Sequence, residues 1–281
     1  MEIKSLEHTD FDTLFRGFDD AFSDYGIHFE KEEVRSMLKR RGYNPELSFA
    51  AFDNGEIVAF TLNGTGIFNG IPTAYDTGTG TIKRYRGQGL AGKIFTHSIP
   101  FLQNADVRQY LLEVLQDNQK AISLYSKMNF RVTRRFDCFR QAIDKIDNLN
   151  GNTECMVRQV DVDSIRYAQE CCDFSPSWQN SIDSIERGAS DLICIGAFWG
   201  REMAGHCVLD ACTGDLAQMA VQRKYRRKGI ASRLLQEALG RMKTDFVKIL
   251  NVSSGSFAMH AFLENKNIPL ASRQLEMMMP L

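Results

Sequence analysis

Apolar residues in the first part of the chain recur at helical spacing and then form two short runs. Residues 11–22 carry phenylalanine and leucine at intervals of three and four, which predicts a helix with Thr9 as its expected N-cap. Apolar runs at 47–52 and 57–62 flank an Asn-Gly dipeptide at 54–55. Because Asn-Gly favours the positive φ angles of a type I′ turn, these two runs predict a β-hairpin.

The second part of the chain repeats this succession of patterns. Weaker helical patterns cover residues 161–172 and 182–186, and two apolar runs at 192–198 and 203–209 are joined around Gly200. The same order of expected elements in both parts indicates one kind of domain used twice.

Each part also contains a later strand pattern, at residues 110–115 and 246–252, followed by a helical one. This order of helices and strands is typical of an α/β domain with a central sheet. The polar stretch 144–152 has the composition of a linker. We therefore expect an N-terminal domain at residues 1–146 and a C-terminal domain at residues 147–281.

A basic, glycine-bearing string occurs once in each half. Residues 83–91 read KRYRGQGLA, and residues 223–231, displaced by 140 positions, read RKYRRKGIA. Each string stands before an amphipathic helix, where first-turn N–H groups have no partner within the helix and attract anions such as a pyrophosphate. Gly87, Gly89 and Gly229 have no Cβ to obstruct a phosphate. A plain turn at the start of a helix is the alternative interpretation of either copy taken alone.

These strings resemble the acetyl-CoA pyrophosphate loop, [Q/R]-x-x-G-x-[G/A], of the GNAT superfamily of N-acetyltransferases. The first half is also similar to a later GNAT segment in its residues Leu112, Glu113, Val114, Asn118, Ala121, Leu124, Tyr125 and Phe130. The resemblance covers about residues 45–135 and 190–270. It implies two tandem α/β (α+β) domains, each with a mixed, mostly antiparallel central sheet flanked by helices. It also implies acetyl-CoA as the co-substrate and an amine as the acceptor.

The resemblance assigns residues that would bind acetyl-CoA. The backbone of residues 79–82 would pair with the pantetheine arm like an added strand, Asn118 would hydrogen-bond its amide region, and the two loops would hold pyrophosphate. The candidates are Thr81, Ile82, Arg86, Gly87, Gln88, Gly89, Leu90, Ala91 and Asn118 in the first half, and Arg226, Arg227, Lys228, Gly229, Ile230 and Ala231 in the second.

By the same resemblance, Tyr125 would lie beside the thioester sulfur and assist the leaving thiolate. Glu113 and Asp76 are the candidates for the base that takes the proton of the amine, directly or through water. Other interpretations stay open at each position. Tyr125 also fits a buried core tyrosine, Asn118 a helix N-cap, and both acids ordinary polar strand residues.

The two halves differ at the positions that carry this chemistry. Aligning Ala121 with Ala258 places Gly255 opposite Asn118 and Phe262 opposite Tyr125. A phenylalanine cannot donate a proton to a thiolate. We therefore expect catalysis in the first half, with the second half binding acetyl-CoA weakly or acting as a structural pseudo-domain. A catalytic second half and a non-catalytic CoA-binding or regulatory module are the alternatives.

Composition limits the remaining function classes. The 281 residues are 43% hydrophobic and 25% charged, with 34 basic and 35 acidic residues and a formal net charge of −1, which argues against a nucleic-acid binder. No apolar run approaches the roughly 18 residues of a membrane span. The seven cysteines lack C-x-x-C spacing, so we expect no metal site and a cytoplasmic protein. The expected partners are acetyl-CoA and a primary amine of a small molecule or peptide, while the oligomeric state is not indicated.

Overall fold

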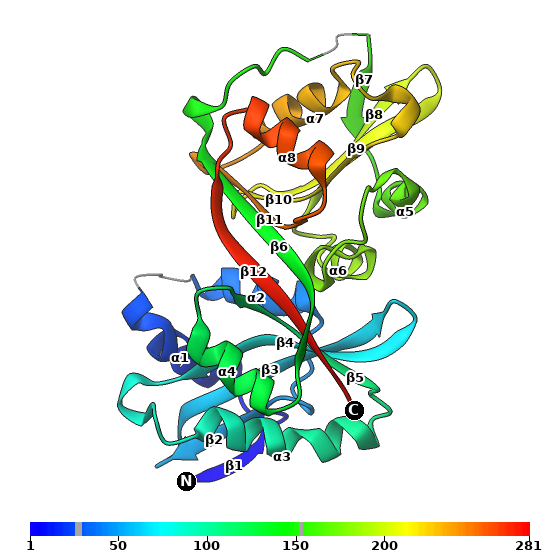
Figure 1. Ribbon diagram of the computed structural model, residues 1–281. Coiled ribbons are helices and arrows are strands. Elements are labelled where there is room, and N and C mark those ends of the chain that lie inside the picture. Colours follow the sequence, from blue (N-terminus) through cyan, green and yellow to red (C-terminus); the bar gives the residue numbers. More distant parts are fainter. Residues whose placement is uncertain (26–29, 152–153) are drawn as a thin grey trace. The chain divides into compact units, whose positions relative to one another are not determined.

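The computed structural model describes residues 1–25, 30–151 and 154–281 (Figure 1). Its internal contacts divide the chain into unit 1, Met1–Thr133 with Leu275–Leu281, and unit 2, Arg134–Gln274. This division differs from the expected domains at 1–146 and 147–281. The difference arises because the end of the last strand packs in unit 1, whereas residues 134–146 pack in unit 2.

The sheet of unit 1 has the strand order β1-β2-β3-β4-β5-β12. Its pairs are antiparallel from β1 to β4, and β4 and β5 run parallel. In chain order the elements are β1 (Glu2–Ser5), α1 (Phe11–Phe22), α2 (Lys31–Arg41), β2 (Phe49–Asp53), β3 (Glu56–Phe68), β4 (Ile71–Thr81), α3 (Leu90–Asn104), β5 (Gln109–Leu115), α4 (Gln119–Lys127) and the end of β12 (Leu270–Pro280). Single 3₁₀ turns lie at Ser23–Tyr25 and Lys83–Tyr85.

The sheet of unit 2 has the order β6-β11-β10-β9-β8-β7. Only β10 and β11 are parallel among these pairs. The elements are β6 (Arg131–Ala142), β7 (Met156–Gln159), α5 (Val162–Tyr167), α6 (Ile182–Arg187), β8 (Ile193–Trp199), β9 (Glu202–Asp210), β10 (Asp215–Val221), α7 (Ile230–Leu239), β11 (Phe246–Ser253) and α8 (Phe257–Asn265). Each unit thus has the expected mixed, mostly antiparallel sheet.

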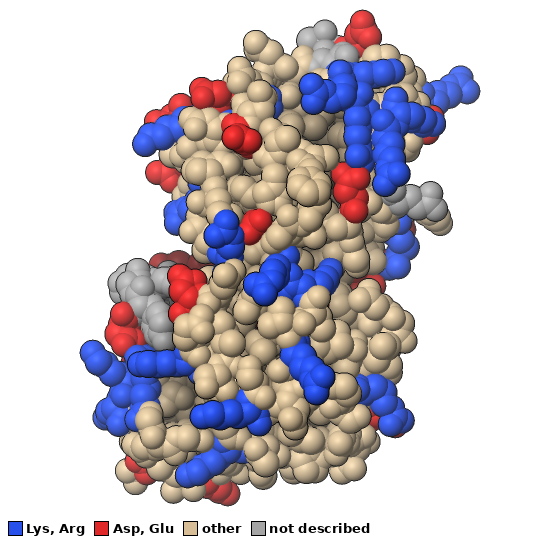
Figure 2. Space-filling model, viewed as in Figure 1, with Lys and Arg blue, Asp and Glu red and all other residues tan. Residues whose placement is uncertain are grey.

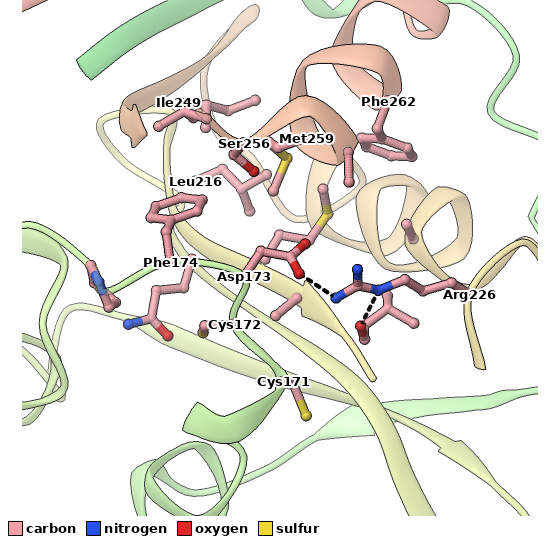
Figure 3. A pocket seen from close by; sticks show the side chains of 18 of the residues that line it. Cys171, Cys172, Asp173, Phe174, Leu216, Arg226, Ile249, Ser256, Met259 and Phe262 are labelled. Atoms are coloured by element: carbon pink, nitrogen blue, oxygen red, sulfur yellow. Dashed lines mark hydrogen bonds and ion pairs between the residues drawn. The ribbon is translucent and has the colours of Figure 1, made fainter. Parts of the chain in front are cut away.

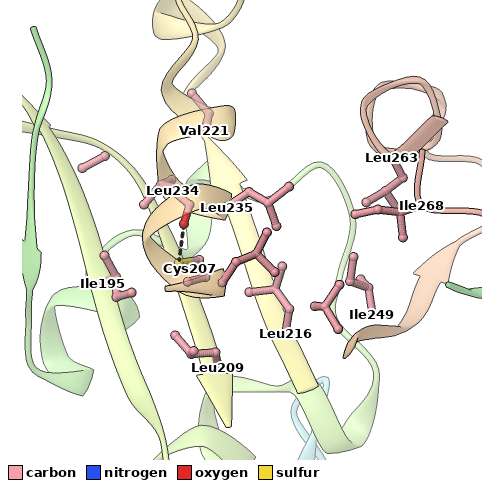
Figure 4. Close-up of a cluster of buried hydrophobic side chains, with 14 of the residues drawn as sticks. Ile195, Cys207, Leu209, Leu216, Val221, Leu234, Leu235, Ile249, Leu263 and Ile268 are labelled. Carbon is pink, nitrogen blue, oxygen red and sulfur yellow. Dashed lines mark hydrogen bonds between the residues drawn. The ribbon is translucent and has the colours of Figure 1, made fainter. Parts of the chain in front are cut away.

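Both faces of each sheet are covered, which explains why the central strands read as unbroken apolar runs. Successive side chains of β2 point to opposite faces. Ala50 and Phe52 therefore join the core beneath α1 and α2, whereas Phe49 and Ala51 pack on the other face with Ile94 of α3. Figure 4 shows the corresponding core of unit 2, where α7 packs against β8, β9 and β10.

Several local predictions can be checked directly. The hairpin between β2 and β3 is confirmed, with positive φ at Asn54 (52°) and Gly55 (85°) as a type I′ turn requires. The predicted Thr9 cap is wrong, because Asp10 accepts the hydrogen bond from the Thr13 N–H. An aspartate makes this charge-assisted cap one position closer to the helix. The predicted linker at 144–152 begins with a 3₁₀ turn at Ile143–Lys145, and its end at Asn152 lies outside the described residues.

Candidate active site

The two parallel strands of each unit share a register over only a short stretch. The pairs of β4 and β5 run from Thr73↔Gln109 to Tyr75↔Leu111, and those of β10 and β11 consist of Asp215↔Lys248. Just beyond these pairs the register of the neighbouring antiparallel strand shifts, with the extra residue at Thr77 in β4 and Ala217 in β10. These β-bulges lie 140 positions apart, at equivalent places in the two units. We call the place where the two parallel strands of a unit stop pairing, β4 and β5 or β10 and β11, the opening of that unit.

The loop between β4 and α3 leaves open space at the start of the helix. Gly87 and Gly89 have positive φ (79° and 72°), and a Cβ built on either would meet no heavy atom within 4 Å. N–H groups of the first helical turn lack partners within α3 and favour an anion. The loop therefore fits a phosphate group. Leu90 contributes only its backbone here, because its side chain is buried in the core.

The arginine at the start of each loop has partners within the protein itself. Arg86 Nε donates to the Thr81 carbonyl (2.9 Å), and its guanidinium forms two 2.7 Å bonds with Asp24. This bidentate pair lowers the pKa of Asp24. Arg226 repeats the arrangement, with Nε bonded to the Val221 carbonyl (2.9 Å) and a terminal nitrogen to Asp173 (2.8 Å). Both side chains anchor the loops within the fold, and their contact with the cofactor stays a prediction.

The loop of unit 2 has the same backbone shape with different side chains. Arg227 adopts a positive φ of 60° where the first loop has Gly87, and Gly229 (77°) corresponds to Gly89. The amine of Lys228 lies over the ring of Trp199, 4.7 Å from its centre. Ile230 is buried in the core like Leu90, and Ala231 is half-buried.

The backbone groups expected to bind pantetheine divide between the two edges of β4. The Ile82 N–H donates to the Val58 carbonyl of β3 (3.0 Å), so it is already used within the sheet. Because successive residues of a strand direct their backbone groups to alternate sides, Thr79 and Thr81 direct theirs toward the opening. The carbonyl of Thr81 accepts from Arg86, as described above.

The structure brings Asp76 and Tyr125 together at the opening. The Tyr125 hydroxyl donates to Asp76 Oδ2 (3.3 Å), which also accepts from the Thr79 hydroxyl (2.8 Å), and the Gly78 N–H donates to Oδ1 (2.9 Å). Burial raises the pKa of Asp76 to about 6, although these hydrogen bonds act in the opposite direction. Burial, and then the neighbouring carboxylate, raises the pKa of Tyr125. An acid that titrates near neutral pH beside a tyrosine suits proton transfer.

The other predicted side chains lie in separate arrangements. Glu113 accepts a hydrogen bond from the Tyr75 hydroxyl (3.2 Å) on the neighbouring strand. Asn118 is the N-cap of α4, accepting from the Ala121 N–H (3.1 Å), so its cap interpretation is confirmed. This role is compatible with its amide also contacting a ligand.

Unit 2 contains a cavity of about 550 Å³ at its own opening (Figure 3). The bulges and the parallel pairs show which residues of the two units correspond. Four residues of unit 2 line the cavity and correspond to polar residues of unit 1: Leu216 to Asp76, Met219 to Thr79, Leu250 to Glu113 and Phe262 to Tyr125. The polar groups of the first opening therefore have apolar counterparts in the second.

Comparisons with known proteins agree with this repeated architecture. The family model described as "Acetyltransferase (GNAT) family" matches residues 12–130, and the one described as "Acetyltransferase (GNAT) domain" matches residues 168–264. The chain belongs to the GNAT family. A solved tandem GNAT protein from the clavulanic acid biosynthesis pathway has the same fold, with a TM-score of 0.76 and 12% identity over 99% of this chain and 98% of that one.

Two curated relatives of this GNAT chain are similar over shorter stretches. N-alpha-acetyltransferase 30 from Schizosaccharomyces pombe is 31% identical over 87 residues, which are 31% of this chain and 58% of the relative. N-alpha-acetyltransferase MAK3 from Arabidopsis thaliana is 28% identical over 101 residues, or 36% of this chain and 53% of the relative. The chain thus spans little more than half the length of these relatives.

Two residues that anchor the loops of the GNAT units, Asp24 and Asp173, had no signal in the sequence that linked them to these loops. Asp24 and Asp173 lie 62 and 53 positions before their arginines, in segments with no pattern that links them to the loops.

Within the part of the chain that the structure describes, no cluster of His, Cys, Asp or Glu could hold a metal ion. No helix of the described residues is long and apolar enough to cross a membrane. The visible face of each unit carries both basic and acidic side chains (Figure 2).

Proposed function

We propose that this protein is an acetyl-CoA-dependent N-acetyltransferase of primary amines, with its catalytic site in unit 1. The observation that carries the proposal is the hydrogen-bonded pair of Asp76 and Tyr125 at the opening between β4 and β5. The same strand, β4, leads into the loop whose open glycine positions fit a phosphate group. A cytoplasmic location is part of this proposal and rests on the cysteine pattern of the sequence.

The proposed reaction needs a base, an electrophilic carbonyl and a stabilised leaving group. The amine nitrogen attacks the thioester carbonyl carbon while its proton passes to the Asp76 carboxylate, directly or through water. A backbone N–H at the bulge stabilises the oxygen of the tetrahedral intermediate. The C–S bond then breaks, its electron pair leaves with sulfur, and the Tyr125 hydroxyl donates a hydrogen bond or its proton to the thiolate.

The names of the curated relatives suggest which amine to test first. Both are N-alpha-acetyltransferases, so the α-amine of a peptide is the first acceptor class, followed by primary amines of small molecules. Because the chain spans only part of those relatives, the acceptor is tested on this protein itself.

A second candidate, catalysis or regulation by unit 2, is favoured by the cavity beside its own loop. Leu216 and Phe262, the apolar residues of unit 2 that correspond to Asp76 and Tyr125, argue against acetyl transfer in unit 2 by the same groups. The two candidates predict different outcomes when one loop is blocked.

The deciding experiment blocks each loop in the full-length protein. Gly89→Glu and Gly229→Glu are matched variants, because both glycines have φ near 75° and each precedes its helix directly. We expect Gly89→Glu to abolish acetylation of a peptide library and Gly229→Glu to retain it, as measured by mass spectrometry and by calorimetry with acetyl-CoA. Circular dichroism checks that each variant is folded.

A further variant examines the leaving-group role. We expect Tyr125→Phe to lower kcat by about 10²-fold or more, within the range of acid–base catalysis, while acetyl-CoA affinity changes little. Turnover that survives Gly89→Glu and is lost in Gly229→Glu would transfer the activity to unit 2. No turnover of any amine by the wild type, despite binding, would favour a CoA-binding regulatory module.

A further inference from the structure

The cavity of unit 2 carries apolar side chains at four positions where unit 1 has polar ones. Leu216, Met219, Leu250 and Phe262 stand where unit 1 has Asp76, Thr79, Glu113 and Tyr125. Phe174, Ile249 and Met259 also line it, and Figure 3 shows these side chains around a common space. In this cavity of about 550 Å³, the part lined by these side chains favours an apolar group. The four positions supply neither the base nor the acid proposed for unit 1.

One buried polar atom in this cavity has no partner. Ser256 is 8% exposed and lines the cavity, and its hydroxyl oxygen has no hydrogen bond to any described residue. Buried hydroxyls are normally paired, so this one points to a ligand with a polar group. The hydroxyl is not activated as a nucleophile, because His260 bonds the backbone carbonyl of Ser256 through Nδ1 (2.8 Å) and Asp137 through Nε2 (2.7 Å).

The other end of the cavity is suited to an anion. Gly229 and Arg227, both with positive φ, line it at the N-terminus of the ten-residue helix α7. Arg227 is exposed, so its charge is available at the cavity. The occupant therefore needs a phosphate end, a middle part with hydrogen-bonding groups, and an apolar end.

We propose that unit 2 binds a coenzyme A thioester whose acyl group is apolar and longer than acetyl, and that it holds this thioester without transferring the acyl group. The pyrophosphate lies at the α7 loop, a polar group of the pantetheine arm pairs with Ser256, and the acyl chain lies among the apolar residues. Transfer to a cavity cysteine is disfavoured, because burial raises the pKa of Cys172 to about 12 and keeps its thiol protonated. This site is separate from the one proposed for catalysis.

The test uses the full-length Gly89→Glu protein, so that the loop of unit 1 is blocked. Calorimetry compares CoA, acetyl-CoA and hexanoyl-CoA, and chromatography measures free CoA released in the presence of an amine. We expect one site, at least tenfold tighter for hexanoyl-CoA than for acetyl-CoA, since each fully buried methylene contributes about a fourfold gain. We expect no release of CoA, and no binding once Gly229→Glu is added.

Two further variants test the cavity of unit 2 without adding Gly229→Glu, which could itself prevent folding. Ser256→Ala should weaken all three ligands severalfold without lowering the melting temperature of the free protein, because the lost hydroxyl had no partner. Leu216→Asp should reduce the preference for the longer chain. Equal affinity for the two thioesters, absence of binding in folded Gly89→Glu protein, or release of CoA by it would overturn the proposal. Loss of turnover in Gly89→Glu relative to wild type tests unit 1 separately.

Discussion

At the residue scale, the properties of Asp76 come from its surroundings. It stands in the bulged part of β4, receives three hydrogen bonds, and is buried enough that its pKa rises to about 6. The raised pKa means that the fold disfavours the carboxylate relative to the unfolded chain above that pH. Such a cost is common where a side chain is kept for chemistry.

The pH dependence of turnover follows from this pKa. With saturating substrates, and after correction for the unprotonated fraction of the amine, kcat should fall as the pH drops through about 6, because protonated Asp76 cannot accept a proton. Asp76→Asn should lower kcat by about 10²- to 10⁴-fold and remove this inflection. Since the carboxylate is disfavoured, the melting temperature at neutral pH should not fall. Exposed Asp106→Asn is the control, and an unchanged inflection in Asp76→Asn would contradict the assignment.

A second residue-scale feature is the left-handed conformation of Arg227. For residues other than glycine this conformation costs about 1–2 kcal/mol, and the first loop has Gly87 at this place. Arg227→Gly should therefore raise the free energy of unfolding of unit 2 by up to about 1 kcal/mol, offset in part by the greater freedom of glycine in the unfolded chain. Gly87→Arg should lower that of unit 1. Chemical denaturation measures the change in the free energy of unfolding in each variant. Changes of the same sign in both variants would contradict an effect of the left-handed conformation.

At the scale of elements, each glycine-bearing loop is anchored to the segment between two strands, β1 and β2 in unit 1 and β7 and β8 in unit 2. Arg86 joins the loop before α3 to Thr81 of β4 and to Asp24 after α1. Arg226 joins the loop before α7 to Val221 and Asp173 in the same manner. The loop backbone is thus positioned before a ligand arrives, which lowers the entropy cost of binding.

Asp24→Asn tests this anchoring. Without the carboxylate, Arg86 loses its bidentate partner, so we expect KM for acetyl-CoA to rise severalfold while kcat changes little. Asp173→Asn is the matched control in unit 2 and should leave both constants unchanged if unit 1 is catalytic. Steady-state kinetics of the two variants decides. A fall in kcat with an unchanged KM in Asp24→Asn would contradict an anchoring role.

At the scale of the whole molecule, the last residues of the sequence, Leu275–Leu281, pack in unit 1 together with residues Met1–Thr133. Leu275, Met277 and Met279 of β12 are buried with Phe95 and Tyr110 in a core of unit 1. This is why the contact-defined unit includes Leu275–Leu281. A fragment cut at the expected boundary after residue 146 lacks these side chains.

Met277→Ala measures the contribution of this last strand. Met277 is 1% exposed, so truncation should lower the free energy of unfolding of unit 1 by about 2–5 kcal/mol. Hydrogen exchange should show lost protection in β5 and α3, with α7 unaffected. Met156→Ala, at a position 55% exposed, is the control and should change little. Equal loss of protection in α7 would argue against assigning this strand to the core of unit 1.

The sequence alone determined the features that depend on local periodicity and short spacing. The repeated string at 83–91 and 223–231 and the Asn-Gly hairpin are local in this sense, and the fold and the family followed from them; the cap at Asn118 was one of two interpretations that the sequence left open. The replacement of Tyr125 by Phe262 was also visible, because a helical segment preserves its spacing from Ala121 to Tyr125 and from Ala258 to Phe262.

Only the tertiary structure decided the features made by contacts between distant segments. It showed a hydrogen bond between Tyr125 and Asp76, which are 49 positions apart. It also showed that Arg86 and Arg226 pair with the carboxylates of Asp24 and Asp173. It also placed the end of the last strand, from Leu275 onward, in the first unit and left the Ser256 hydroxyl without a partner among the described residues, in a cavity. Burial and hydrogen bonding depend on what folds against a residue, and the local pattern around that residue does not contain this information.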